Sequence, residues 1–290
     1  FVDVYKISCI KGSNQDQVIS TLLQGASQLT EQDALGSNIK QAGLFVFPDN
    51  TYGKEGYSNY VIEEKKNVRD PILKKTKKIN VFRLTDVLKN TITLSNLKNF
   101  SIKYHNIFNL IRKKPKECHF IYCDLIKGSG LQLFTLLLEH LLDYRRCNLK
   151  NYDDKSKPKY ILLTGESKSN YQIKLINKFN EEGNKDGDYV NVIIGTDKIK
   201  QGVSFNHIQH IHITIPHWNY AKTEQIIARG IRFGSHKYLS VKTVVKVYLY
   251  TLFTSNNKSH DEYVYKLCSQ KDKSIKSVEY NIKLNAIDCN

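Results

Sequence analysis

The chain has 290 residues, and its 44 Lys and Arg against 28 Asp and Glu give a formal net charge of +16 at pH 7. This length predicts one large domain or two small ones, and hydrophobic and charged shares of 40% and 25% exclude a mostly disordered chain. No apolar run approaches the roughly 18 residues that a membrane-spanning helix needs, and the first residues lack the layout of a secretory signal.

The positive charge favours an anionic partner, with nucleic acid as the first candidate and an anionic membrane surface as the second. However, most of the basic residues are Lys, and the chain is also rich in Asn and Ile. An AT-rich genome produces that composition without selection for binding. The charge alone therefore leaves both interpretations open.

Residues 1–100 are expected to form an irregular segment, a linker or insertion that enters the next domain. A short strand is predicted at Val2–Ile7 and a helix at Asn14–Leu23. A turn-rich stretch follows at 47–53. The Lys-heavy run 63–78 is predicted to be solvated surface rather than a binding tract, although its charge fits either role.

From residue 101 to 255 the pattern changes to short apolar runs that alternate with helical segments. The predicted strands are His119–Cys123, Tyr160–Thr164, Val190–Gly195, His210–Ile215 and Thr243–Phe253, and the predicted helices are Ile102–Lys113, Leu131–Tyr144, Ser169–Asn180 and Thr223–Ile231. This alternation is typical of βαβ units in an α/β fold, with a mostly parallel sheet flanked by helices. Residues 256–290 are predicted to be a turn followed by a C-terminal helical extension.

Two groups of side chains resemble metal ligands, but neither has a suitable arrangement. Cys118 and Cys123 lie in a predicted strand, where alternation prevents them from converging on one ion, so buried free thiols are favoured over a zinc site. His210 and His212 share one face of another predicted strand without a third ligand. The sequence therefore predicts no metal site, and six scattered Cys fit a reducing compartment.

The polar loops that follow three predicted strands are the candidate site, because a parallel sheet places working residues at the carboxyl ends of its strands. These loops are 164–169, 195–205 and 216–220. The last loop leads to Arg229 and Arg232, which lie three apart on one face of a predicted helix. A guanidinium can donate two hydrogen bonds to phosphate oxygens at once and can stabilise a transferring phosphoryl group. Without further context, surface ion pairs are the simpler interpretation of this pair.

Other conspicuous residues are interpreted as structural. Asp124 and Asp197 follow strands and are expected to be turn formers rather than metal ligands. The segment 127–130 lacks the spacing of a phosphate-binding loop and is expected to begin the helix at Leu131. Trp218 is expected to pack against the next helix rather than stack on a base.

Spaced motifs in the right order change the interpretation of the arginine pair, because they resemble those of superfamily 2 helicases and translocases. Gln201-Gly202-Val203-Ser204 resembles the fifth motif, Gln225-x-x-Ala228-Arg229-x-x-Arg232 the sixth, and His119–Tyr122 the fourth. Pro216-x-Trp218-Asn219, Leu163-Thr164-Gly165 and Phe179-Asn180 resemble segments of Snf2-type translocases. The stretches 232–236, 45–49 and 286–289 are similar to those of the NTPase I and early-transcription-factor helicases of large cytoplasmic DNA viruses. The similarity covers most of the chain, most firmly residues 118–236.

The resemblance implies a RecA-like second helicase domain and gives roles to individual residues. Arg232 would be the arginine finger that reaches the γ-phosphate on the first domain, with Arg229 beside it, and Gln225 would contact the nucleotide or couple the domains. Gly202 would let the backbone approach the cleft between the domains, and Ser204 would lie near the ribose or couple the cleft to nucleic acid. The nucleic-acid phosphates would be contacted by Thr164, Lys168, Thr196 and Lys198. Ala228 and Gln172 depart from the family, since many relatives have Gly and Arg there, and Gln172 is given no role.

The chain lacks a phosphate-binding loop and an Asp-Glu-x-His or Asp-Glu-x-Asp motif. The resemblance places both on a first domain upstream of Phe1, and the absence of Met even at position one favours a piece of a longer polypeptide. ATP with Mg²⁺ would then be bound mainly by the missing domain, and this fragment alone should not hydrolyse ATP.

The implied function is that of a nucleic-acid-dependent NTPase in viral transcription: initiation, termination or transcript release. Its partners would be DNA, with RNA as an alternative, and viral RNA polymerase or transcription-factor subunits. A membrane partner is not expected. Its location would be the viral factory in the host cytoplasm and the virion. The alternative is a non-catalytic basic module with a degenerate helicase fold that binds nucleic acid or RNA polymerase.

Overall fold

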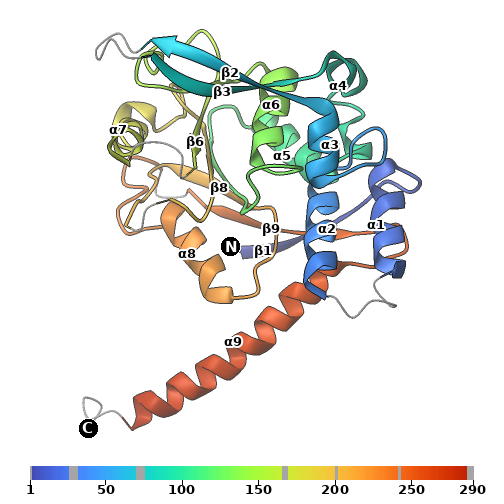
Figure 1. The fold of residues 1–290 in the computed structure, drawn as a ribbon. Helices are drawn as coiled ribbons and strands as arrows, with labels where there is room; N and C mark the ends of the chain where they lie inside the picture. Colours follow the sequence, from blue (N-terminus) through green and yellow to red (C-terminus); the bar gives the residue numbers. More distant parts are fainter. Residues whose placement is uncertain are drawn as a thin grey trace.

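The computed structural model describes residues 2–25, 32–69, 76–164, 169–199, 202–240 and 243–285. Its centre is a seven-stranded parallel sheet with the order β1-β9-β8-β4-β7-β6-β5, and helices cover both of its faces (Figure 1). The strands of this sheet are β1 (Val2–Ser8), β4 (Cys118–Tyr122), β5 (Arg145–Arg146), β6 (Lys159–Leu163), β7 (Val192–Gly195), β8 (Ile208–Ile213) and β9 (Lys246–Phe253). The helices are α1 (Asn14–Gly25), α2 (Gln32–Leu44), α3 (Gly53–Tyr60), α4 (Asp86–Thr91), α5 (Ile102–Lys113), α6 (Leu131–Leu142), α7 (Ser169–Phe179), α8 (Tyr220–Gly230) and α9 (His260–Leu284).

The alternation predicted for residues 101–255 is confirmed. The five predicted strands are β4, β6, β7, β8 and β9, and the four predicted helices are α5, α6, α7 and α8. Helix α6 begins at Leu131, directly after its N-cap Gly130, so the 127–130 segment does begin that helix. The α/β class with a parallel sheet is therefore correct.

The first hundred residues are more regular than the sequence predicts. Strand β1 pairs in parallel with β9 along its whole length and forms one edge of the main sheet. Much of the Lys-heavy run lies in an antiparallel hairpin of β2 (Val61–Arg69) and β3 (Thr76–Leu84). The local pattern could not show the pairing of β1, because its partner is distant in the sequence. The domain boundary at residue 100 stays a prediction. The main sheet contains strands from both sides of this residue.

The central strand β4 is buried on both faces, which explains its uninterrupted apolar sequence. Phe120 belongs to a core cluster that contains Phe179 of α7 and Ile226 of α8. Ile121 points to the opposite cluster, which the aromatic side chains of α5 and α6 fill. Cys118 and Cys123 belong to these two different clusters and are buried free thiols, as predicted.

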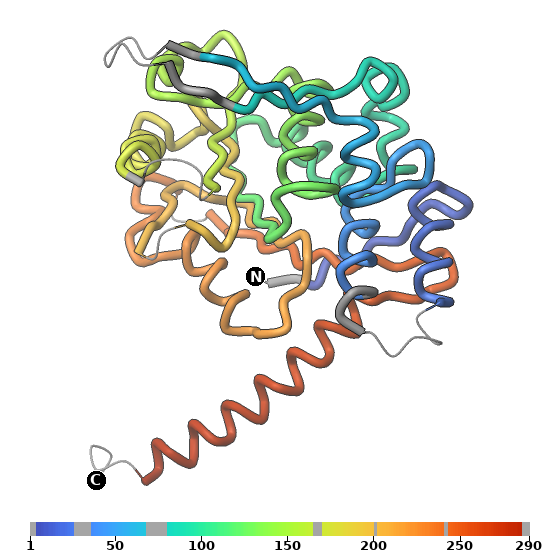
Figure 2. The backbone as a smooth tube through the Cα atoms, in the orientation of Figure 1, coloured from blue at the N-terminus to red at the C-terminus, as the bar shows by residue number. Residues whose placement is uncertain are grey.

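Helix α9 leaves the body of the molecule and projects from it (Figures 1 and 2). Val264 and Cys268 on its first turns are buried, whereas every side chain from Lys273 to Leu284 is exposed. The predicted C-terminal extension is thus a single long helix within the described residues. None of the helices in the described ranges is both long and apolar enough to cross a lipid bilayer.

Candidate functional site

The carboxyl edge of the sheet brings the three predicted polar loops together. Thr164 follows β6 and Thr196 follows β7, while Asp124 and the 214–219 segment follow β4 and β8. These four strands are neighbours in the order β6-β7-β4-β8. Since adjacent strands lie about 4.8 Å apart, the four strand ends form a continuous row of roughly 14 Å.

Arg232, Gly202 and Ser204 meet just beyond the end of α8. The Nη1 atom of Arg232 donates hydrogen bonds to the carbonyl oxygen of Gly202 at 3.2 Å and to Ser204 Oγ at 3.0 Å. Gly202 has φ +83° and open space where a Cβ would lie, so the left-handed backbone is what favours glycine here. Three residues that the sequence assigned to one nucleotide-coupling site therefore lie in contact.

Arg229 holds the same loop from inside. Its Nη2 donates to the carbonyl oxygen of Ile199 at 3.3 Å, and its own carbonyl oxygen accepts from the backbone N–H of Phe205 at 2.8 Å. Burial lowers the pKa of Arg229, but a guanidinium remains charged in proteins. Arg229 thus positions the loop that Arg232 contacts.

The remaining predicted site residues differ in accessibility. Gln225 on α8 and Lys198 after β7 are exposed. Thr196 and Thr164 are buried, and Thr196 Oγ1 accepts from the backbone N–H of Lys198 at 3.2 Å. Lys168 lies outside the described residues. The structure therefore places four of these five residues, and the two hydroxyl groups are covered by protein.

Two amide side chains secure these loops without having been assigned a role. Asn180 Nδ2 donates to the carbonyl oxygen of Ser204 at 2.9 Å, and its Oδ1 accepts from the backbone N–H of Asn206 at 2.7 Å. Gln172 Nε2 donates to the carbonyl oxygen of Thr164 at 2.6 Å. The Phe179-Asn180 motif was the signal for the first residue, whereas the second was noticed only as a departure from the family and was given no role.

Asp124 is more than a turn former, which corrects the sequence interpretation. It accepts hydrogen bonds from the Tyr122 hydroxyl at 2.6 Å and from Lys222 Nζ at 2.9 Å, and it pairs with His217 Nδ1 at 3.1 Å. Burial raises the pKa of Asp124, but the hydrogen bonds from His217, Lys222 and Tyr122 outweigh it and hold the pKa below its usual range. The carboxylate therefore joins the ends of β4 and β8 as a charged acceptor.

Trp218 lies at the surface, at the start of the segment that leads into α8. Its side chain is 44% exposed. Lys40 Nζ lies 5.8 Å from the centre of its ring and Lys271 Nζ lies 5.6 Å from it. A cavity of about 290 Å³ is lined by Trp218 and Lys40 together with His217, Lys222 and Asp124. The indole is thus an open, cation-flanked surface at the end of β8.

A third histidine, His119, lies beside the predicted pair on β8 and comes from a distant part of the chain. The ring of His119 on β4 stacks 4.6 Å from His210 and 5.4 Å from His212, measured between ring centres. Burial lowers the pKa of His119 to about 3, so its imidazole is neutral. No group of three or more His, Cys, Asp or Glu in the described residues is arranged to hold a metal ion.

Comparison with known proteins identifies the central part of the chain. The family described as the helicase conserved C-terminal domain matches residues 102–234. The chain is 32% identical over 268 residues to protein 087L of Invertebrate iridescent virus 3, which is named as a helicase; the alignment covers 89% of this chain and 26% of that protein. It is 29% identical over 235 residues to nucleoside triphosphatase I of Melanoplus sanguinipes entomopoxvirus, covering 79% of this chain and 34% of that protein.

Among solved structures, the C-terminal part of the Fun30 ATPase domain is similar, with 14% sequence identity, a TM-score of 0.48 and coverage of 92% of this chain and 89% of that one. The chain spans only about a quarter to a third of the length of the two viral relatives. The matched segment contains both arginines and all three loops of the candidate site. Residues 102–234 therefore match the helicase conserved C-terminal domain, in a chain that is similar to viral proteins named as helicases and nucleoside triphosphatases.

Proposed function

We propose that this chain is the C-terminal half of an ATP-dependent nucleic-acid translocase or helicase that acts in viral transcription. The observation that supports this function most strongly is the contact of Arg232 with Gly202 and Ser204 at the end of α8. In the proposed role, this loop and helix face a nucleotide held mainly by another domain of the longer protein. The viral origin of the relatives supports a place in the viral factory and virion, with viral RNA polymerase or its factors as partners.

In the proposed role, Arg232 is an arginine finger that its contacts with Gly202 and Ser204 position before the nucleotide binds. Its side chain is exposed, and the hydrogen bonds described for it both come from one of its nitrogen atoms, Nη1. A guanidinium has five N–H donors, so others remain to bind phosphate oxygens. ATP with Mg²⁺, when bound, supplies the phosphoryl group and part of its charge neutralisation. Arg232 would stabilise the negative charge of the transferring phosphoryl group, and Arg229 would hold the loop in place. Gln225 would contact the nucleotide or couple the two domains.

The row of strand ends offers a path for one nucleic-acid strand. Lys198 is exposed there, and we propose that it binds phosphate together with Lys168. Thr164 and Thr196 are buried, so they would contact phosphates only through movement of their loops or through backbone groups. Phosphate and sugar contacts of this kind bind largely without regard to sequence and weaken with salt, which fits DNA and RNA alike.

The test is ATP hydrolysis by the full-length protein that contains this chain, with and without single-stranded DNA. Arg232→Ala should lower the turnover roughly 10³-fold, the scale on which a missing arginine finger acts. Arg112→Ala is the matched control, since Arg112 lies in the last turn of α5, outside the candidate site. Unchanged turnover in the Arg232 variant would exclude the finger. If neither protein hydrolyses ATP but both bind DNA, the non-catalytic binding module is the correct function.

A further inference from the structure

Two segments outside the matched helicase domain place lysines beside Trp218. Lys40 belongs to α2 and Lys271 to α9, and both lie beyond residues 102–234. Their ammonium groups lie 5.8 and 5.6 Å from the centre of the same indole ring. Neither lysine forms an ion pair with a carboxylate of the described residues. Two cations near one ring repel each other, so an anion between or beside them would be stabilised.

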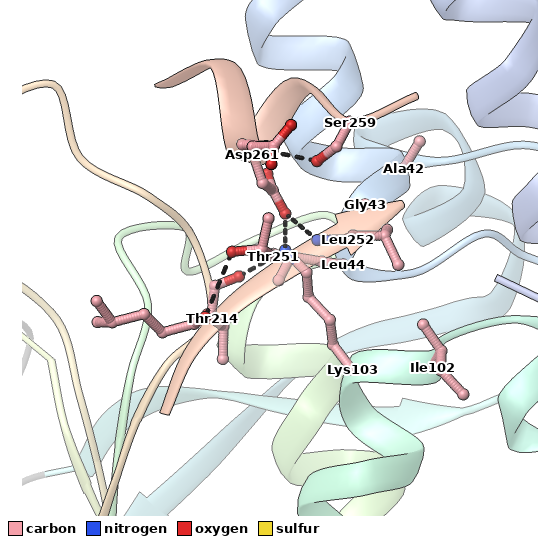
Figure 3. Close-up of polar contacts among 12 residues, drawn as sticks. Ala42, Gly43, Leu44, Ile102, Lys103, Thr214, Thr251, Leu252, Ser259 and Asp261 are labelled. Atoms are coloured by element: carbon pink, nitrogen blue, oxygen red, sulfur yellow. Dashed lines mark hydrogen bonds and ion pairs between the residues drawn. The ribbon is translucent and has the colours of Figure 1, made fainter. Parts of the chain in front are cut away.

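The two helices that carry these lysines are anchored at the first turn of α5. Lys103 is fully buried, and its Nζ donates to Asp261 Oδ2 at 2.7 Å and to the carbonyl oxygen of Thr214 at 2.8 Å (Figure 3). Asp261 Oδ2 also accepts from the backbone N–H of Leu252 at 3.0 Å. The first turn of α9 is therefore held to the ends of β8 and β9. Lys271 lies ten residues along the same helix, about 15 Å from this anchor.

Helix α2 is tied to the same turn of α5. Gln15 Nε2 donates to the carbonyl oxygens of Ala42 and Gly43 at the end of α2, at 3.1 and 3.3 Å. Gln15 Oε1 accepts from the backbone N–H of Ile102 at 3.0 Å. Neighbouring residues of α5 thus hold the two helices that bring Lys40 and Lys271 to Trp218, and Figure 3 shows the end of α2 and the start of α9 at this anchor.

We propose that α2 and α9 complete a binding pocket for one nucleotide unit of a single nucleic-acid strand, with the base on Trp218 and phosphate between Lys40 and Lys271. An exposed aromatic ring beside cations is the arrangement that binds single strands through stacking and charge. The pocket also continues the row of strand ends, since β8 follows β4, β7 and β6. Asp124 does not oppose a phosphate strongly, because His217, Lys222 and Tyr122 already contact its carboxylate. This inference rests on the proposed nucleic-acid function.

The test uses the 290-residue chain, whose only Trp is Trp218. Titration with single-stranded oligothymidylate and, separately, oligouridylate should quench its fluorescence and show whether DNA, RNA or both are bound. Lys40→Gln and Lys271→Gln should each weaken binding and reduce the salt slope of log K against log[salt] by about 0.7, the value for one phosphate contact on a single strand. Lys271→Arg should restore the wild-type slope.

Lys273→Gln is the matched control, because it removes the same charge from the same helix, about 200° around its axis from Lys271. Equal slopes for the Lys273, Lys271 and Lys40 variants, with normal binding by the wild type, would overturn the pocket and leave the proposed function intact. Binding without any change in Trp218 fluorescence would also overturn it. If the chain binds neither oligonucleotide, both the pocket and the binding of a single strand by this chain are contradicted. The ATPase test would still decide the role of Arg232.

Discussion

Lys103 is a charged side chain that folding removes almost completely from water. Its ammonium lies 2.7 Å from a carboxylate oxygen of Asp261 and 2.8 Å from the carbonyl oxygen of Thr214. Breaking such a pair by neutralising one partner leaves a buried charge without its counterion. Removing one partner of this pair should therefore cost stability.

Asp261→Asn should lower the free energy of unfolding by about 3–5 kcal/mol, because the buried side chain of Lys103 would lose the carboxylate that pairs with it. The double variant Lys103→Met with Asp261→Asn should regain much of this loss, since the charge is gone and the amide oxygen still accepts from Leu252. Urea denaturation followed by circular dichroism measures both. A double variant no more stable than Asp261→Asn would show that the charge is not the cause.

Helix α3 shows how one glycine can be required by packing alone. A Cβ on Gly56 would lie 2.1 Å from Phe47 Cδ2 and 2.6 Å from Thr51 Oγ1. Phe47 is fully buried and stacks on Tyr60 with 5.3 Å between ring centres, so its ring has little room to move. Gly56 sits in a helix, where alanine would otherwise be the better residue.

Gly56→Ala should therefore destabilise the protein by about 1–3 kcal/mol, the usual effect of overpacking. The control is Gly36→Ala in α2, where the nearest atom to a new Cβ would be 4.0 Å away; it should stabilise the protein by about 0.5–1 kcal/mol through helix propensity. Thermal unfolding of both variants shows whether Gly56→Ala lowers the stability and Gly36→Ala raises it. A stabilising Gly56→Ala would mean that Phe47 moves aside easily.

At the scale of the whole molecule, the sheet contains imidazoles whose pKa values burial lowers. Burial lowers the pKa of His119 to about 3 and depresses those of His210 and His212, with Glu117 beside His210 only partly opposing the effect. The unfolded chain binds these protons near pH 6.5. Below that pH the unfolded state holds more protons, so stability falls as the pH falls.

The free energy of unfolding should therefore be steady above about pH 6.5 and decrease below it by up to roughly 1.4 kcal/mol per pH unit for each fully buried histidine. Urea unfolding between pH 7.5 and 5 measures this slope. His119→Phe removes one such imidazole from the stack and should flatten the curve. A constant stability across this range would contradict the lowered pKa values of the three rings.

The sequence by itself determined the parallel sheet of residues 101–255 and the gathering of polar loops at one edge of it, because both follow from local signals, whereas the roles expected of Arg232, Gly202 and Ser204 came from the family resemblance. Hydrophobic runs mark strands, and the carboxyl ends of parallel strands meet at one edge. Only the tertiary structure decided the pairing of β1 with β9, the third histidine beside the pair on β8, and the exposure of Trp218 near Lys40 and Lys271. These features depend on which distant segments become neighbours. The choice is made by burial of the whole core and by anchors such as Lys103 with Asp261, which no local pattern contains.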